Sequence, residues 1–419
     1  MKSAIKTTIL FLSLTLLISS CCTSRVETYR TQMWAEVKIS MDKVRDSVKI
    51  SGAREIKSSG KIYTIGNYIL ISEKNAGVHI IDNSNPTQPK NISFITIPGN
   101  GDIAVKNNYL YADSYVDLLT FDISNPASPK FEKRVDAIFN STLTSEWAHL
   151  DEKTNMLSTY KLVDTIITYT INDCNDYSVS PVDRSFEGGA TNNASKSGSG
   201  SSGKGGSMAR FTIYDKYLYT VCNTALQTFD IENPANPKAW AQINIGWNIE
   251  TIYPFKGKLF IGSRTGMFIY DVSTPWNPTY ISQFNHFRAC DPVVADDKYA
   301  YVTLKGGNNC GNNLNQLDII DISNIFDPKL IKSYPMQGPL GVGIDDEILF
   351  VCDSKAGLKV FDASKPDDIK LLDWESDFNT YDIIPMGKRA IVVAEDGIYQ
   401  YDYSNPKDMK LISKIPFIK

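Results

Sequence analysis

The chain has 419 residues, of which 42% are hydrophobic and 11% aromatic, so it can bury a large core. Its formal net charge is −4, which excludes the strongly basic surface that binds nucleic acid. A chain of this length forms one domain only as a large ring of repeats; otherwise its length predicts two or three domains.

The first 20 residues have the features of a secretory signal peptide. Lys2 and Lys6 precede an apolar run, Ile9 to Ile18, which is shorter than the roughly 20 residues of a membrane-spanning helix. Ile18-Ser19-Ser20-Cys21 resembles a bacterial lipobox. This resemblance implies that residues 1–20 are removed and that a lipid on Cys21 anchors the protein to the outer membrane. It leaves open which face of that membrane the protein occupies.

Residues 21–59 are predicted to form a tether and a short helix. The polar tether covers residues 22 to about 35. The helix covers Ser40 to Val48, with Ser40 as its N-cap. The sequence leaves open whether residues 49–58 pair with the last repeat.

A short signature recurs seven times between residues 60 and 419. It is an apolar strand followed by an aspartate and a turn, as in Phe121-Asp122-Ile123-Ser124-Asn125-Pro126. A period of roughly 40 residues built from short strands is typical of a β-propeller blade. We therefore predict an all-β fold, a seven-bladed β-propeller of four-stranded antiparallel blades. The signature aspartates are Asp82, Asp122, Asp230, Asp271, Asp321, Asp362 and Asp402.

These aspartates are expected to have a structural role. A carboxylate at this position can accept a backbone N–H bond from two residues further on, and proline ends the strand because it cannot donate to a ladder. A metal-binding role is the alternative, but the aspartates lie in different blades, too far apart to share an ion. The sequence has only three histidines, so no multi-histidine metal site and no cofactor are predicted.

An insertion at about residues 140–207 separates the second and third repeats. Within it, Met156 to Tyr160 and Thr165 to Ile171 are predicted to form a hairpin that turns at Val163-Asp164. Lys196 to Gly206 is rich in glycine and serine and is predicted to be a flexible linker.

Six cysteines besides Cys21 would lie in an oxidising compartment. Cys290 and Cys310 fall in loops at the same end of the fifth blade, and we expect them to form a disulfide. Cys222 and Cys352 occupy equivalent strand positions and are expected to be small buried side chains.

Four of the repeats share one pattern of apolar residues before the aspartate. They are Val78-His79-Ile80-Ile81-Asp82, Leu118-Leu119-Thr120-Phe121-Asp122, Leu317-Asp318-Ile319-Ile320-Asp321 and Leu358-Lys359-Val360-Phe361-Asp362. With the lipobox, this pattern resembles the LVIVD-repeat family of bacterial β-propeller lipoproteins. The resemblance implies a propeller fold and an envelope location, and it implies no catalytic residues.

Ligands of propellers usually bind at the channel mouth, on the face where the inner strands begin. The candidate ligand-binding residues on that face are Asp102, Trp247, Arg264, His286, Arg288, Tyr381 and Asp382. Aromatic and arginine side chains together are typical of a binding surface. We expect Trp247, Arg264, His286 and Arg288 to converge with the insertion, which is predicted to enter on this face.

The favoured function is non-catalytic: a monomeric envelope propeller that binds or scaffolds a protein or glycan partner. One alternative is a glycan-active hydrolase or lyase in which Asp102 and Asp382 act as acid and base. Another is a structural component of an envelope assembly. The sequence leaves catalysis open and does not identify the partner.

Overall fold

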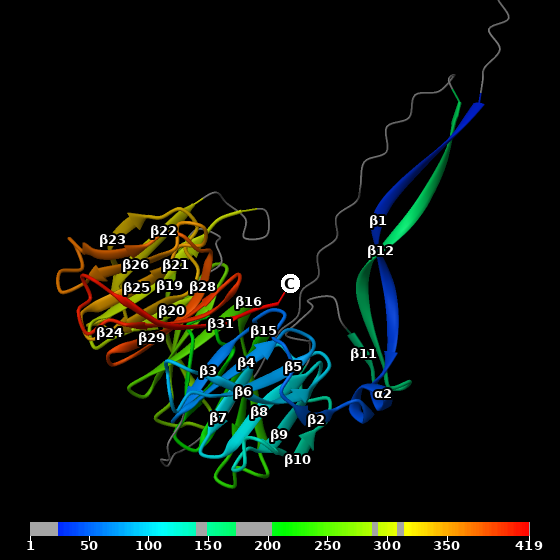
Figure 1. Cartoon of the computed structure of the whole chain (residues 1–419), viewed down its shortest axis with the longest axis horizontal. Helices are drawn as coiled ribbons and strands as arrows, with labels where there is room; N and C mark the ends of the chain where they lie inside the picture. The colour runs from blue at the N-terminus through cyan, green and yellow to red at the C-terminus, as the bar shows by residue number, and fades with distance from the viewer. Residues whose placement is uncertain (1–23, 140–148, 173–202, 287–291, 308–313, 419) are drawn as a thin grey trace, which may run out of the picture. The chain divides into compact units, whose positions relative to one another are not determined.

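Figure 1 shows the computed structural model of the chain, which describes residues 24–139, 149–172, 203–286, 292–307 and 314–418. Contacts divide the chain into two units. We call the first, residues 1–37 and 159–188, the arm, and the second, residues 38–158 and 189–419, the propeller.

Several predictions made from the sequence lie outside the described residues. They concern the signal peptide, Cys21, Arg288, the Cys290–Cys310 pair and most of the Gly/Ser-rich stretch.

The propeller contains seven blades of four antiparallel strands, as predicted. The strands of blades one and two are β3 (Ile62–Ile65), β4 (Tyr68–Glu73), β5 (Gly77–Asp82), β6 (Lys90–Thr96), β7 (Ile103–Lys106), β8 (Tyr109–Ser114), β9 (Asp117–Asp122) and β10 (Lys130–Val135). Blades three and four contain β14 (Phe211–Tyr214), β15 (Tyr217–Asp230), β16 (Lys238–Phe255), β17 (Lys258–Ser263), β18 (Gly266–Asp271) and β19 (Thr279–Asn285). Blades five to seven contain β20 (Val293–Ala295), β21 (Tyr299–Lys305), β22 (Asn315–Asp321), β23 (Lys329–Pro335), β24 (Val342–Asp345), β25 (Ile348–Cys352), β26 (Leu358–Asp362), β27 (Lys370–Glu375), β28 (Thr380–Met386), β29 (Arg389–Ala394), β30 (Gly397–Asp402) and β31 (Lys410–Pro416).

Blades three and four form one continuous six-stranded sheet because two of their strands run on without a break. β15 contains both the second and the third strand of blade three. Its two ends lie side by side, because Ile231 N, directly after β15, donates to Lys216 O, directly before it, over 2.8 Å. β16 is first the outer strand of blade three, pairing with β15, and then the inner strand of blade four, pairing with β17. The number of blades is unchanged by this fusion.

The signature turns lie at one end of the blades. In all seven, Oδ1 of the aspartate accepts the backbone N–H two residues further on, over 2.5–2.9 Å. The turn is also bonded to the first hairpin turn of its blade, as where Asn83 N donates to Asn67 O over 2.7 Å. We call this end the turn face, and the opposite end, where the inner strands begin, the mouth face.

The signature turn also joins neighbouring blades. The carbonyl at its proline position accepts a hydroxyl hydrogen bond from the preceding blade at most of the blade interfaces. The bonds are Ser93 to Pro126, Tyr111 to Pro234, Tyr219 to Pro275, Ser282 to Ile325, Tyr334 to Pro366 and Ser413 to Pro86. Each gives a backbone carbonyl at the interface a hydrogen-bond donor. The repeat therefore sets both the end of a strand and the attachment of the next blade.

The ring closes through side chains of blades one and seven. The amides of Asn83 and Gln400 exchange two hydrogen bonds, of 2.9 and 2.8 Å. Isoleucines of both blades share one buried cluster, and Ile418 N donates to Ile56 O over 2.8 Å. The short strand β2 (Lys49–Gly52) pairs with β6 at the outer edge of blade one and not with the last blade.

The predicted helix is present as α2 (Met41–Asp46), although Ser40 makes no side-chain cap bond. Met41 and Val44 are buried against Val116 of blade two. Arg45 binds the buried carboxylate of Asp117 through two hydrogen bonds, of 2.8 and 3.0 Å. A bidentate pair of this kind holds the helix in one orientation on the mouth face of blade two.

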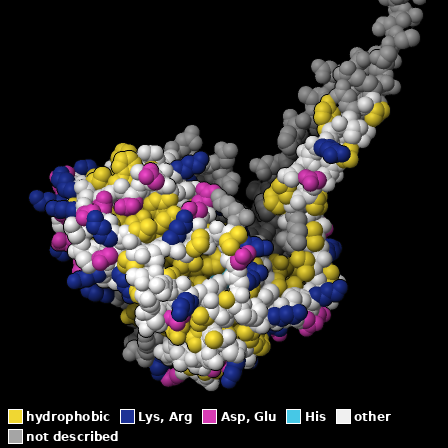
Figure 2. All heavy atoms as spheres, viewed as in Figure 1, with side chains coloured by type: hydrophobic (Ala, Val, Ile, Leu, Met, Phe, Trp, Pro, Cys, Tyr) yellow, Lys and Arg dark blue, Asp and Glu magenta, His cyan; other side chains and the backbone are white. Residues whose placement is uncertain are grey.

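Two predictions for the arm are wrong. Residues 24–35 belong to the long strand β1 (Ser24–Ser40) and are not a tether, and the predicted hairpin is one strand, β12 (Met156–Asn172). β12 pairs with β1 and, at its first residues, with β11 (His149–Asp151). β1 and β12 are paired although they lie more than 100 residues apart in the chain, as where Gln32 donates to Asp164 over 2.9 Å. Figure 2 shows hydrophobic side chains on the surface of the arm. Trp34, in β1, is 69% exposed.

Cys222 and Cys352 are buried, as predicted. No helix within the described ranges has the length and apolar character needed to cross a membrane.

Candidate functional site

Seven residues at the mouth end of the inner strands, one from each blade, occupy one level of the channel. Backbone hydrogen bonds to the second strand place Lys61, Asp102, Arg210, Pro292 and Gly341 at equivalent positions, and strand pairing does so for Thr251 and Asp382. The charged members lie in the consecutive blades seven, one, two and three. Their signs alternate, as Asp382, Lys61, Asp102 and Arg210. One half of the channel mouth is therefore charged and the other half is neutral.

Both aspartates of this level are buried and held by backbone donors. Asp102 accepts Ile103 N over 2.7 Å with one oxygen and Arg210 N with the other. Burial raises the pKa of Asp102 to about 6, although the charge of Lys61 opposes that shift. Asp382 accepts Ile383 N over 2.9 Å, and burial raises its pKa as well. The ammonium of Lys61 donates to Met208 O, and burial lowers its pKa.

A third buried aspartate, Asp113, shapes the loop before Asp102. Oδ1 of Asp113 accepts Asn100 Nδ2, Gly101 N and Asp102 N over 3.0, 2.7 and 2.8 Å. Burial raises the pKa of Asp113 to about 7. Three donors on one oxygen fix the path of residues 100–102, and so they fix where the Asp102 carboxylate lies.

The last described part of the insertion, residues 203–209, lies inside the channel, and we call it the return segment. Gly203 N donates to Val105 O over 3.0 Å, on the inner strand of blade two. The short strand β13 (Lys204–Gly205) pairs with β3, the inner strand of blade one. Lys204 also donates to Pro385 O of blade seven over 2.8 Å. These contacts lie toward the turn face.

The second half of the return segment lies at the mouth face. The hydroxyl of Ser207 donates to Oδ1 of Asp382 over 3.1 Å and accepts Val342 N over 2.9 Å. Ile252 N donates to Ala209 O over 2.9 Å. The return segment therefore runs through the channel from the turn face to the mouth, and it contacts the inner strands of five blades.

The glycines of the return segment are required for space. A Cβ on Gly203 would lie 2.5 Å from the ring of Tyr63, and one on Gly206 would lie 2.0 Å from Oδ2 of Asp382. Real Cβ contacts are not this short, so no larger residue fits without movement. The prediction of a flexible linker is wrong for Gly203, Gly205 and Gly206, which pack inside the ring.

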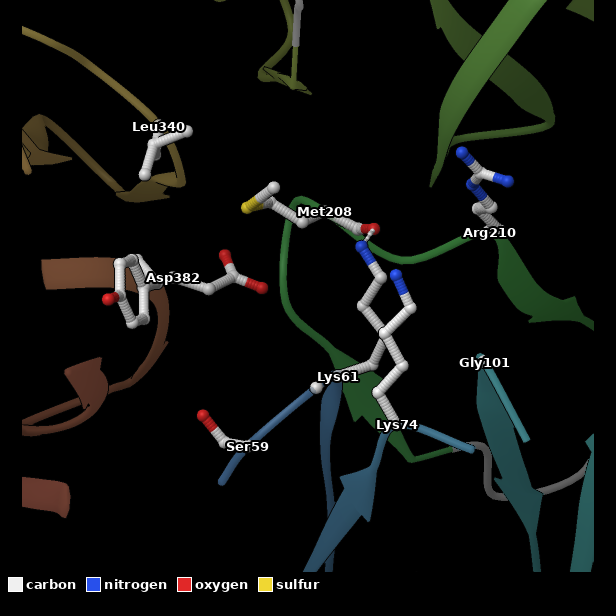
Figure 3. Close-up of a pocket in the computed structure, with 10 residues that line it drawn as sticks. Ser59, Lys61, Lys74, Gly101, Met208, Arg210, Leu340 and Asp382 are labelled. Atoms are coloured by element: carbon white, nitrogen blue, oxygen red, sulfur yellow. Dashed lines mark hydrogen bonds between the residues drawn. The ribbon is translucent and has the colours of Figure 1, made fainter. Parts of the chain in front are cut away.

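A cavity of about 320 Å³ opens above the return segment at the mouth. Figure 3 shows Lys61, Lys74 and Arg210 on one side of it and Asp382 on the other, with Met208 of the return segment between them. Ser59 and Tyr381 complete the wall. The return segment closes the channel below, so the mouth is a pocket with a floor.

Three of the seven blades match a known family of sequence repeats. The model of the LVIVD repeat matches residues 58–94, 100–137 and 288–335, which correspond to blades one, two and five. The chain therefore contains LVIVD repeats, as the resemblance implied. No curated protein matches it.

Solved structures with the same fold have little sequence in common with the LVIVD-repeat protein. A protein from Lactobacillus plantarum has a TM-score of 0.54 and 11% identity, over 86% of this chain and 97% of that one. The computationally designed Ika8 protein has a TM-score of 0.51 and 8% identity, over 87% and 89% of the two chains. At these identities the likeness shows the fold alone.

The structure brings some of the predicted site residues together. In the LVIVD-repeat protein, Asp102, Tyr381 and Asp382 all lie at the mouth. Arg264 lies at its rim, where it binds Glu250 over 2.8 Å. Arg210 also donates to the backbone oxygen of Glu250, over 3.2 Å, so Arg264 is one residue removed from the pocket.

Other predicted residues lie apart from this pocket. His286 lines a separate cavity with Phe284, Leu304 and Asp318, between blades four and five. Trp247 is 47% exposed and does not line the mouth pocket. The described start of the insertion lies on the mouth face, where Phe139 N donates to Val116 O over 3.0 Å, whereas the return segment enters the channel from the turn face.

Lys61, Lys74, Arg210 and Ser207 were not predicted. Three of them are charged residues near loops, where a solvated side chain is the ordinary expectation. Lys61 and Arg210 could have been found by aligning, across all blades, the residue five positions before the first residue of the first hairpin turn. No set of three or more potential metal ligands occurs among the residues the structure describes.

Proposed function

We propose that this LVIVD-repeat protein is a non-catalytic binding protein of the cell envelope, with its recognition site at the channel mouth. The observation that carries this proposal is the return segment, which turns an open channel into a pocket with a fixed floor. A preformed concave site with a few convergent polar groups is the usual form of a ligand site. The partner is a protein or glycan that presents a polar group to this pocket.

The bonding of the two mouth aspartates favours binding over catalysis. Both oxygens of Asp102 accept backbone N–H groups, and Oδ1 of Asp382 accepts a backbone N–H and the Ser207 hydroxyl. Donors of this kind favour a fixed carboxylate that supports the loop. Burial raises the pKa of Asp102 to about 6 and also raises the pKa of Asp382, and these shifts favour the alternative of a glycan hydrolase or lyase.

The proposal places the protein at the outer membrane through a lipid on Cys21. Support comes from the lipobox-like sequence Ile18-Ser19-Ser20-Cys21. Labelled fatty acid fed to cells should be incorporated into the wild-type chain and not into Cys21→Ala. Equal labelling of both chains would contradict the anchor.

Binding at the mouth is tested with immobilised envelope polysaccharide and envelope protein fractions. Lys74→Glu reverses one charge of the pocket, and Lys365→Glu is the control because it changes an exposed lysine in a turn-face loop. We expect retention of the full-length chain to fall at least tenfold for Lys74→Glu and to stay unchanged for Lys365→Glu. Equal retention of the three chains would place recognition elsewhere. Release of shortened glycan by the wild type would favour the enzyme.

A further inference from the structure

The mouth pocket has more cationic than anionic side chains in its wall. Lys61, Lys74 and Arg210 line it, against the carboxylate of Asp382, and the buried carboxylate of Asp102 faces Lys61 and Arg210 from behind the wall. Glu250 stands behind Arg210 but is neutralised by its ion pair with Arg264, at 2.8 Å. Like charges that share one small cavity repel each other, and an anion bound between them would relieve that repulsion.

The cations differ in how fully the protein itself satisfies them. Lys61 donates to Met208 O, and Arg210 donates to Glu250 O over 3.2 Å. For Lys74, the described residues provide neither a hydrogen bond nor an ion pair, and Figure 3 shows its side chain directed into the cavity. Lys74 comes from the loop between β4 and β5, so its ammonium can move toward a ligand without disturbing an inner strand.

Ser59 provides a second, independent sign of a ligand. Its hydroxyl oxygen is buried, lines the same cavity and has no hydrogen-bond partner among the described residues. A buried hydroxyl without a partner is costly, and in a native site it often marks the place of a ligand or a water. A hydroxyl beside two lysines and an arginine is a suitable set of donors for an oxygen-rich anion.

The size of the pocket limits the ligand. A cavity of about 320 Å³ lies at the lower end of the range for small-molecule sites. It accepts one sugar ring with its acidic substituent, and the ring of Tyr381 on the wall offers an apolar face for such a ring. A longer glycan would extend outward from the mouth.

We infer that the channel mouth binds an oxyanion carried by a sugar-sized group, held by Lys61, Lys74, Arg210 and Ser59. The anion is the carboxylate of an acidic sugar or the phosphate of a phosphorylated sugar. This inference rests on the proposed function, since it names the ligand chemistry of the same site.

Calorimetric titration of the full-length protein with three probes tests it: galacturonate, glucose 6-phosphate and neutral glucose. We expect at least one anionic probe to bind at least tenfold more tightly than glucose, and its affinity to fall as salt is raised. The probe that binds identifies the source of the anion. Lys74→Met keeps the apolar stem of the side chain and should weaken that binding at least tenfold, whereas Lys365→Met should not change it.

Equal affinity for glucose and the anionic probes would overturn the inference, as would unchanged binding by Lys74→Met. So would the absence of binding by both anions at millimolar concentration. If Lys74→Glu still loses retention on envelope fractions while no anion binds, the mouth recognises a partner of other chemistry. In that case the proposed function stands and the oxyanion inference fails.

Discussion

The hydroxyl of Ser207 lies 3.1 Å from Oδ1 of Asp382, although the two residues are 175 positions apart in the chain. Ser207 belongs to the insertion after blade two, and Asp382 lies near the start of β28, the inner strand of blade seven. Because Ser207 also accepts Val342 N of blade six, one hydroxyl connects the return segment to two blades at the mouth. The position of the pocket floor therefore depends on a segment that is not part of any repeat.

Gly206→Ala should destabilise the protein, because the added Cβ would lie 2.0 Å from the buried carboxylate of Asp382. Overpacking of this kind costs about 1–3 kcal/mol. Urea unfolding should therefore show a lower midpoint. Gly52→Ala is the matched control, since nothing lies within 4 Å of its Cβ position, and we expect its stability to be unchanged or slightly higher. Equal midpoints for wild type and Gly206→Ala would show that the glycine is not enclosed.

Arg45→Met should loosen α2 from blade two, because it leaves the buried carboxylate of Asp117 without its bidentate partner. The pair is part-buried, so we expect a loss of about 1–3 kcal/mol, between the values for exposed and buried pairs. Hydrogen exchange of residues 41–48 should become faster. Lys43→Met, an exposed change on the same helix, should leave exchange as in the wild type. If the two variants exchange alike, the ion pair does not hold the helix.

Gln400→Leu should weaken the closure of the ring. It removes both hydrogen bonds to the side chain of Asn83 and leaves that buried amide without these partners. Loss of a partner from a buried polar group costs about 1–3 kcal/mol. Gln88→Leu, at an exposed position of a turn, is the control. Thermal unfolding should show a lower midpoint for Gln400→Leu alone, and equal midpoints would mean that apolar packing suffices for closure.

The stability of the mouth should depend on pH through Asp102 and Asp113. Burial raises their pKa values to about 6 and about 7, whereas an unfolded aspartate has a pKa near 3.9. The folded state therefore holds more protons than the unfolded state between these values. The resulting stabilisation is fully present below about pH 4 and is lost as the pH rises through 6 to 7.

Asp113→Asn tests this dependence, because its carbonyl oxygen can keep the three donors while the ionisable group is removed. Relative to the wild type, the variant should gain about 2 kcal/mol of stability between pH 5 and pH 8. Asp367→Asn, at an exposed turn, should follow the wild type at both values. A constant difference between Asp113→Asn and the wild type across this range would show that Asp113 does not titrate there.

The repeat was predictable from sequence because its turn is a local structure. Each signature aspartate and the N–H that it binds are two residues apart, so spacing alone specifies seven equivalent blades. The strand β1 was not predictable, since its partner β12 is distant in sequence and its polar alternating residues also fit a tether. The return segment was missed for another reason. Gly206 is a glycine because a larger side chain would meet Asp382, but the sequence around it is as rich in glycine and serine as a flexible linker.

At the mouth, Asp102, Tyr381 and Asp382 were predictable because they begin inner strands or lie beside their start. Lys61 and Arg210 occupy the same level, but their role follows only from the register of the blades. Lys74 comes from a different loop of the blade. Its place in the pocket depends on how two loops of blade one meet, which no local pattern specifies.

Hydrogen exchange of the return segment tests the central claim most directly. The amides of Gly203, Gly206 and Ala209 all donate to backbone carbonyls, so residues 203–209 should exchange as slowly as β3, beside which they lie. Exchange of residues 203–209 at the rate of an unfolded chain, while β3 stays protected, would contradict it, because the channel would then be open and the pocket would have no floor.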